Sequence, residues 1–97
     1  MSHSVIWSQQ AVEDVRRLYQ FLAGKNMKAA RVAAAAILRK AEVLDMYPNV
    51  GRPSNDLEPE HRELVIPCGA SGYVMLYEII GSDVIILAVR HQKEAGY

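Results

Sequence analysis

The side chains best suited to chemistry gather near the C-terminal end of the chain. Arg90, His91 and Lys93 directly follow an apolar run at 84–89, and Tyr97 stands at the last position. A strand that delivers cationic and aromatic groups to its own exit holds them on a rigid support, as binding and catalytic sites require. We therefore expect a functional surface at this end of the chain.

Arg90 and His91 are consecutive in an extended stretch, so their side chains should point to opposite faces of a sheet. We expect His91 to be a buried, hydrogen-bonded histidine, and Arg90 to lie on the exposed face, where it can contact a target. Lys93 is typical of a solvated tail. Tyr97 either packs back onto the sheet or offers its hydroxyl group to a ligand.

Two more arginines stand in positions that favour a fixed side chain. Arg52 lies in a Gly-Arg-Pro sequence, and Arg62 directly precedes a predicted strand at 63–66. A guanidinium group has five donors in a rigid fork, so it can either hold a loop or contact a target. For Arg52 the structural role is favoured, with Glu58 or Glu60 as its expected partner.

The sequence predicts no metal site and no cofactor. It has neither the Cys and His spacing of a metal site, nor a Gly-rich phosphate loop, nor a pair of carboxylates at a plausible site. The single cysteine, Cys68, lies in a Pro-Cys-Gly turn with no histidine beside it, so it is expected to be inert. No residue pattern indicates a metabolic enzyme.

Length and composition indicate one globular domain, 1–97. Half of the 97 residues (51%) are hydrophobic, which excludes a disordered chain. Eleven basic residues balance eleven acidic ones, so direct binding to nucleic acid is not expected. The lone cysteine, the absence of a signal peptide and the shortness of the apolar runs at 32–38 and 84–89 predict a soluble, cytoplasmic protein that does not span a membrane.

Two helices are expected to precede most of the sheet. A short strand at 5–7 ends at Ser8, a good helix N-cap, and apolar residues then recur at every third or fourth position until Gly24, where a left-handed turn is expected. Asn26 can cap a second helix, which reaches to about residue 47. Helices with so short a link pack as an antiparallel hairpin. The polar side of the first helix is assigned to Glu13, Asp14, Arg16, Arg17 and Gln20.

The remaining residues predict a loop at 48–60 and three strands, at 63–66, 73–80 and 84–89. The last of these is continuously apolar, so we expect it to be buried on both faces and central. The order β-α-α-β-β-β predicts an α+β domain in which a helical hairpin covers one face of an antiparallel sheet.

Several motifs, in this order, resemble toxins of the RelE/ParE superfamily, the toxic halves of bacterial toxin–antitoxin pairs. They are YPNVGRP at 47–53, REL at 62–64, YVMLY at 73–77 and VRHQKEAGY at 89–97. The likeness extends over residues 4–97 and is greater to the gyrase-directed ParE branch. It implies the RelE/ParE fold, in which the first strand joins the same sheet.

The resemblance implies a ParE-like toxin of the plasmid stabilisation type. Such a toxin inhibits DNA gyrase by protein–protein binding, not by catalysis, and forms a hetero-oligomer with a cognate ParD-like antitoxin. The target surface is assigned to Arg52, Arg62, Arg90, His91, Lys93 and Tyr97. The antitoxin surface is assigned to Val15, Leu18, Leu22, Tyr73, Met75 and Tyr77, although the two tyrosines are equally suited to the core.

Two alternatives remain open. The first is a ribosome-dependent mRNA endonuclease of the RelE type, in which Arg62, Arg90 and Tyr97 would act without a metal. That branch typically has more basic residues around the middle strands, whereas the segment at 72–77 has none. The second alternative is an interaction module of the same fold without toxicity.

Overall fold

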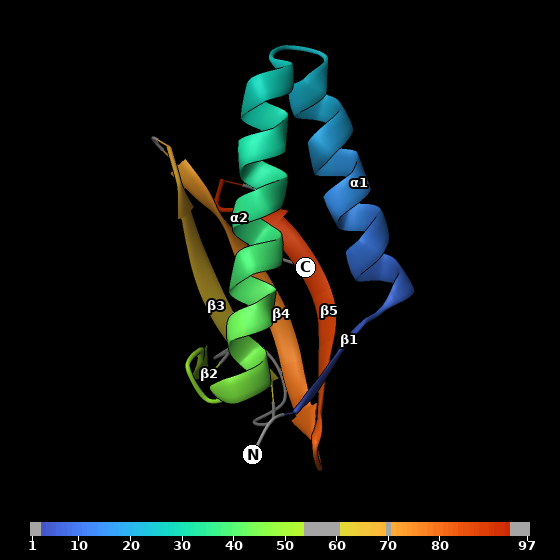
Figure 1. Cartoon of the computed structure of the whole chain (residues 1–97), viewed down its shortest axis with the longest axis vertical. Coiled ribbons are helices and arrows are strands. Elements are labelled where there is room, and N and C mark those ends of the chain that lie inside the picture. Colours follow the sequence, from blue (N-terminus) through green and yellow to red (C-terminus); the bar gives the residue numbers. More distant parts are fainter. Residues whose placement is uncertain (1–2, 54–60, 70, 94–97) are drawn as a thin grey trace.

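The structure is a computed structural model that describes residues 3–53, 61–69 and 71–93. Two helices lie across one face of a sheet, and their hairpin turn extends past the ends of the strands (Figure 1). The elements are β1 (Ser4–Trp7), α1 (Gln9–Ala23), α2 (Met27–Met46), β2 (Arg52–Pro53), β3 (His61–Cys68), β4 (Ser71–Ile80) and β5 (Asp83–His91). The predicted α+β class is confirmed.

The sheet has five strands in the order β1-β5-β4-β3-β2. β3, β4 and β5 form the predicted antiparallel meander, while β1 joins the same sheet and runs parallel to β5. β2 was not predicted, since its residues were assigned to the loop. Arg52 pairs with Glu63, and Pro53 with Arg62, so a two-residue strand protects the start of the β3 edge.

The central strand is β4, so the prediction that 84–89 forms the central strand is wrong. Every residue of β4 from Gly72 to Tyr77 is buried, whereas β5 alternates between buried and partly exposed side chains. The helices cover one face of β5, and its other face is only partly covered. A continuous apolar run therefore did not distinguish a strand buried on both faces from one buried on a single face.

Both predicted helix caps are confirmed. The Ser8 hydroxyl group accepts the N–H of Ala11 at 3.1 Å, and the Asn26 side chain accepts the N–H of Ala29 at 3.1 Å. The expected left-handed conformation of Gly24 is wrong, because its φ is −66° and the chain turns instead through hydrogen bonds to the Leu22 carbonyl. In the described part of the chain, no helix is long and apolar enough to cross a membrane.

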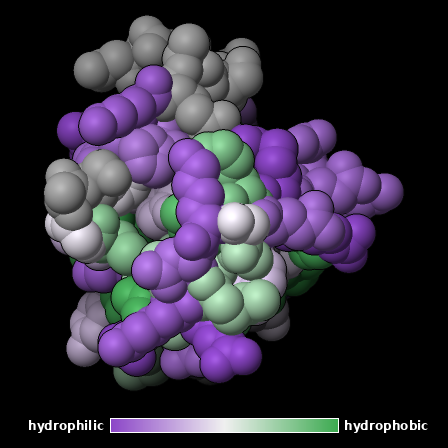
Figure 2. All heavy atoms as spheres, turned by 90° about the horizontal axis from the view of Figure 1, so that it is seen from above, coloured by the Kyte–Doolittle hydropathy of each residue, from purple (hydrophilic) through white to green (hydrophobic). Residues whose placement is uncertain are grey.

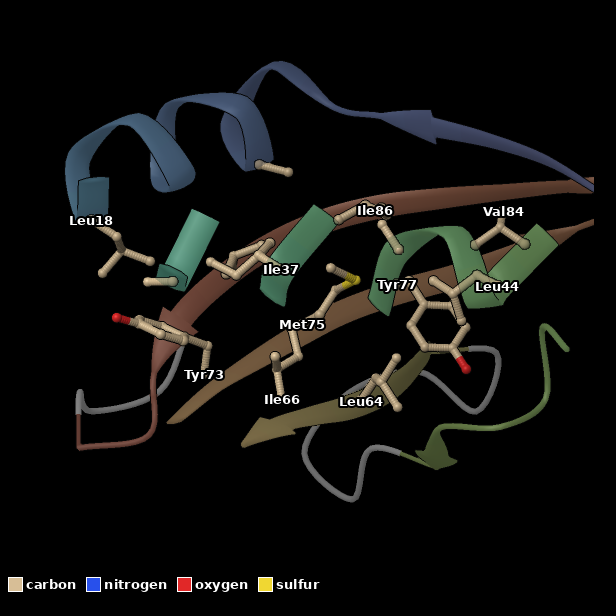
Figure 3. Close-up of a cluster of buried hydrophobic side chains, with 14 residues drawn as sticks. Leu18, Ile37, Leu44, Leu64, Ile66, Tyr73, Met75, Tyr77, Val84 and Ile86 are labelled. Carbon is tan, nitrogen blue, oxygen red and sulfur yellow. The ribbon is translucent and has the colours of Figure 1, made fainter. Parts of the chain in front are cut away.

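The core lies between the helical hairpin and the covered face of the sheet. Small side chains at Ala33 and Ala41 let α2 approach the sheet closely. Figure 3 shows the larger core side chains, with Tyr73 and Tyr77 near opposite ends of the cluster. The labelled residues are Leu18, Ile37, Leu44, Leu64, Ile66, Tyr73, Met75, Tyr77, Val84 and Ile86.

Candidate functional site

A bulge in β5 decides which side chains face the helices at the exit of this strand. Leu76 pairs with Ala88 and Tyr77 with Ile86, so Leu87 has no partner residue on β4. An extra residue reverses the alternation of side chains beyond it. Ile86 faces the core before the bulge, and His91 faces the same side after it, opposite Tyr73.

His91 is held against β4 but is not fully buried. Its ring meets the Tyr73 ring edge-on, with the centroids 5.5 Å apart and an interplanar angle of 86°. Its Nδ1 accepts the backbone N–H of Lys93 at 3.1 Å. The expected hydrogen bond is therefore present, while the expected burial is only partial.

Arg90 points to the sheet face that the helices leave uncovered, as predicted from its alternation with His91. It pairs with Val74, which lies on that face. Its guanidinium group donates to the carbonyl groups of His91 at 3.3 Å and of Gln92 at 3.5 Å. These bonds hold the side chain close to the turn that follows β5.

An apolar groove of about 890 Å³ lies between the turn end of the helical hairpin and the exit of β5. The hairpin extends beyond the strands at this end (Figure 1), and residues of both helices line the groove. Phe21 and Leu22 of α1 and Val32 of α2 line it, together with the largely buried Leu18 of α1 and Tyr73 of β4. Phe21 and Val32 are 62% and 54% exposed, so large hydrophobic groups are available to a partner.

Cations surround the groove. Arg17, Lys28 and Lys93 line it, and among the described residues no carboxylate does. Figure 2 views this end of the molecule and shows hydrophobic side chains bordered by hydrophilic ones. Because the whole chain has no net charge, this concentration of positive charge is local. The arrangement suits a partner with apolar side chains and carboxylates.

A second cluster, at the opposite end of the sheet, fixes the loop after α2. The Arg62 guanidinium group donates to the carbonyl of Gly51 at 2.7 Å and, at 3.4 Å, to that of Asn49. The buried Tyr77 hydroxyl group donates to the Pro48 carbonyl at 2.7 Å and accepts the N–H of Gly51 at 2.9 Å. Burial raises the pKa of Tyr77, although the Gly51 hydrogen bond and Arg62 act in the opposite direction.

Arg52 is exposed beside this loop. Its Nε lies 3.5 Å from a carboxylate oxygen of Glu63, and 65% of its side chain is accessible. The partners expected for it, Glu58 and Glu60, lie outside the described residues. The observed pair follows from the β2–β3 register, which places Arg52 directly opposite Glu63.

The predicted target surface does not form one cluster. His91 and Lys93 lie at the groove, where His91 pairs with Tyr73 of β4. Arg62 of β3 pairs with Tyr77, which lies four residues from Tyr73 along β4, or roughly 13 Å at the rise of an extended strand. Arg62 faces the helices, and Arg90 points to the other face. Tyr97 lies outside the described residues.

The predicted antitoxin surface also divides. Leu18, Leu22 and Tyr73 line the groove, whereas Val15 lines a separate, smaller hollow together with Trp7, Val12 and Leu38. Met75 and Tyr77 have no accessible surface, so their assignment to a partner-covered surface is corrected. They occupy the strand between β3 and β5, on the face that α2 covers.

Sequence reasoning missed Asp14, which is only 8% exposed although it was assigned to the polar side of α1. Its carboxylate accepts the backbone N–H of Val89 at 3.0 Å and a hydrogen bond from the Gln10 amide at 2.9 Å. Its position, three residues after Ala11 and four before Leu18, places it on the apolar stripe of the helix. That spacing was the available signal.

Nothing in the described part of the chain forms a group of three or more His, Cys, Asp or Glu residues able to hold a metal ion. Cys68 is a free thiol at the edge of the groove.

Solved structures with the same fold belong to toxin–antitoxin systems. The chain superposes with a TM-score of 0.77 on the chromosomal ParDE TA system from P. aeruginosa, at 20% identity, covering 93% of this chain and 96% of the other. It superposes at 0.67 on a mutant of the E. coli toxin RelE in the free state, at 15% identity, covering 96% and 86%. These likenesses define the fold as that of RelE/ParE toxins.

Residues 5–96 match the family described as "ParE toxin of type II toxin-antitoxin system, parDE", so the protein belongs to this toxin family. Two relatives from Caulobacter vibrioides carry RelE names. The chain is 33% identical to "Toxin RelE3" over 91 residues, covering 94% of this chain and 96% of the relative. It is 31% identical to "Toxin RelE1" over 94 residues, covering 97% and 98%.

Proposed function

We propose that this toxin inhibits DNA gyrase by protein–protein binding and that a cognate, ParD-like antitoxin neutralises it. The observation that carries the proposal is the apolar, cation-lined groove at the exit of β5, in a chain of the ParE family. In this proposal the protein acts in the cytoplasm as a hetero-oligomer with its antitoxin.

The groove is the proposed antitoxin site. Leu18, Leu22 and Tyr73 receive the apolar side chains of an amphipathic segment, and the surrounding cations pair with its carboxylates. The exposed Phe21 gives this segment an aromatic anchor at the open side of the groove. The antitoxin therefore brings an acidic, amphipathic helix to this end of the hairpin.

Neutralisation follows from the overlap of two surfaces. His91 and Lys93, which we assign to target binding, line the same groove as the antitoxin residues. A segment seated there covers both side chains and excludes the target by direct occlusion. Arg90 and Arg52 extend the proposed target surface outside the groove.

Ribosome-dependent mRNA cleavage is the second candidate, favoured by the RelE names of the Caulobacter relatives. Arg62 and Arg90 argue against it, because they lie on opposite faces of the sheet and both are held by backbone carbonyl groups. RNA cleavage would need cations that converge on the phosphate and stabilise the negative charge of its transition state.

Expression in growing bacteria separates the candidates. After induction, the incorporation of labelled thymidine and of labelled leucine is followed with and without the antitoxin. A gyrase inhibitor lowers thymidine incorporation first, and coexpressed antitoxin restores growth. A fall in leucine incorporation before thymidine would contradict the proposal in favour of the nuclease, and unchanged growth would favour an inactive interaction module.

A further inference from the structure

The buried carboxylate of Asp14 contacts the backbone of a strand 75 residues away in sequence. Its Oδ2 accepts the N–H of Val89, and its Oδ1 accepts the side-chain amide of Gln10. Leaving a carboxylate in an apolar interface is costly unless such bonds compensate for lost hydration. Asp14 therefore supplies a hydrogen-bond acceptor for a backbone N–H group of β5.

β5 requires such an acceptor because β1 is too short to pair with its whole length. The parallel pairing ends at Trp7 and Ile86, although β5 continues to His91. Beyond this point the start of α1 supplies the missing partners. The Ser8 N–H donates to the Ile86 carbonyl at 2.9 Å, the Ser8 hydroxyl group donates to the Leu87 carbonyl at 3.1 Å, and Asp14 accepts from Val89.

These contacts surround the bulge at Leu87. Without the extra residue, the alternation that puts Ile86 in the core would also turn Arg90 toward the helices and His91 away from them. Ser8 holds the strand at the bulge and Asp14 holds it just beyond. The orientation of the groove-lining His91 thus depends on a backbone irregularity that side chains of α1 and its N-cap fix in place.

We propose that Asp14 is a positioning residue that holds the bulged end of β5 so that His91 and Lys93 line the groove. The effect on binding rests on the proposed function, whereas the effect on strand geometry does not. Asp14 acts through the backbone of Val89 on the groove residues His91 and Lys93, without touching a partner itself.

The test compares four variants of the full chain with the wild type. Asp14→Ala removes both acceptors, and Asp14→Asn keeps an amide oxygen for Val89 while the Gln10 amide can turn to match it. Glu13→Ala is the matched control, because Glu13 is the exposed neighbour on α1 and, within the described residues, its side chain accepts a hydrogen bond from Gln9 alone, at 3.4 Å. Leu44→Ala controls for stability, since it empties a core position about 20 Å from the groove along α2.

Three quantities are measured for each variant. Amide hydrogen exchange at Val89 and the proton–proton contact between the Tyr73 and His91 rings are followed by NMR. Antitoxin affinity is measured by calorimetry. We expect Asp14→Ala to raise exchange at Val89, to remove the ring contact and to weaken antitoxin binding by about ten-fold or more. Asp14→Asn and Glu13→Ala should stay within about two-fold of the wild type.

Unchanged Val89 exchange and an intact ring contact in folded Asp14→Ala would overturn the inference. An equal loss of affinity in Leu44→Ala would also overturn it, because the effect would then follow stability alone. The wild type provides a test that needs no variant, since rapid exchange at Val89 there would contradict the hydrogen bond to Asp14. If the wild type fails to bind antitoxin, the proposed function fails, and the NMR results still decide the role of Asp14.

Discussion

The hydroxyl group of Tyr77 ties the loop after α2 to the middle of the sheet. It both donates and accepts a hydrogen bond in a fully buried position, to Pro48 and from Gly51. Tyr77→Phe leaves two buried backbone groups without a partner, so the free energy of unfolding should fall by about 1–3 kcal/mol. Urea denaturation measures this change.

Tyr19→Phe is the control for that substitution. Among the described residues, the Tyr19 hydroxyl group makes one hydrogen bond, to the Met27 sulfur at 3.3 Å in an exposed position, so its removal should change stability little. Equal stability of Tyr77→Phe and Tyr19→Phe would contradict the role assigned to the loop contacts.

The same burial predicts how stability depends on alkaline pH. Burial raises the pKa of Tyr77 and of Tyr73 above the ordinary value of 10.0. A raised pKa in the folded state means that the neutral form is favoured by folding, so the stabilisation is complete below pH 10 and is lost as the pH rises through the folded-state pKa. We expect the free energy of unfolding to decrease above about pH 10, and to decrease less steeply in Tyr77→Phe.

Gly51 allows the close approach on which this cluster depends. A Cβ atom there would lie 2.6 Å from the Tyr77 hydroxyl oxygen and 2.7 Å from the Glu63 carbonyl oxygen. Gly51→Ala must therefore displace the loop or β3. It should lower the melting temperature, whereas Gly24→Ala, which meets only ordinary contacts, should not. An unchanged melting temperature in Gly51→Ala would contradict the observed proximity.

At the scale of elements, the groove depends on the hairpin extending past the strands. The cations of α1 and α2 should steer an acidic antitoxin segment and accelerate its association. Arg17→Glu should reduce the association rate constant by about ten-fold at low salt, with a smaller difference at high salt because the charges are screened. Stopped-flow binding measures the association rate constant at low and at high salt.

Arg31→Glu provides the matched reversal of charge. Arg31 is exposed on α2 but does not line the groove, so its change should affect association less. If both reversals slowed association equally, the groove would not be the site of charge recognition.

Sequence periodicity predicted most elements and much less of the site. The caps at Ser8 and Asn26 and the meander of three strands follow from local patterns, and they are confirmed. β2 was not predicted because it consists of only two residues, Arg52 and Pro53, which are too few to show a strand pattern. That the first strand joins the sheet followed only from family resemblance, and its parallel pairing with β5 was not predicted, since no local pattern encodes a partner so far away in the chain.

The site was harder to predict because it depends on register. The sequence alone does not show that Arg62 and His91 lie at different places on the sheet, because their positions follow from the registers of β3, β4 and β5. The alternation of Arg90 and His91 was predicted, but which of them faces the helices depends on the bulge at Leu87. The cationic border of the groove joins Arg17, Lys28 and Lys93 from three segments, and no linear motif contains them.

At the scale of the whole molecule, a neutral chain places an apolar groove lined by Arg17, Lys28 and Lys93 at one end. This polarity suits protein recognition better than broad contact with nucleic acid. It also places two proposed target residues, His91 and Lys93, in the same groove as the proposed antitoxin residues Leu18, Leu22 and Tyr73, so we expect one bound segment to cover both sets.

The measurement that tests the central claim most directly is DNA supercoiling by purified gyrase with increasing amounts of the toxin. We expect supercoiling to fall or cleaved DNA to accumulate, with full reversal when the antitoxin is added. Lys93→Glu should weaken the inhibition, and Arg31→Glu should not. Full gyrase activity in the presence of excess folded toxin would contradict the account.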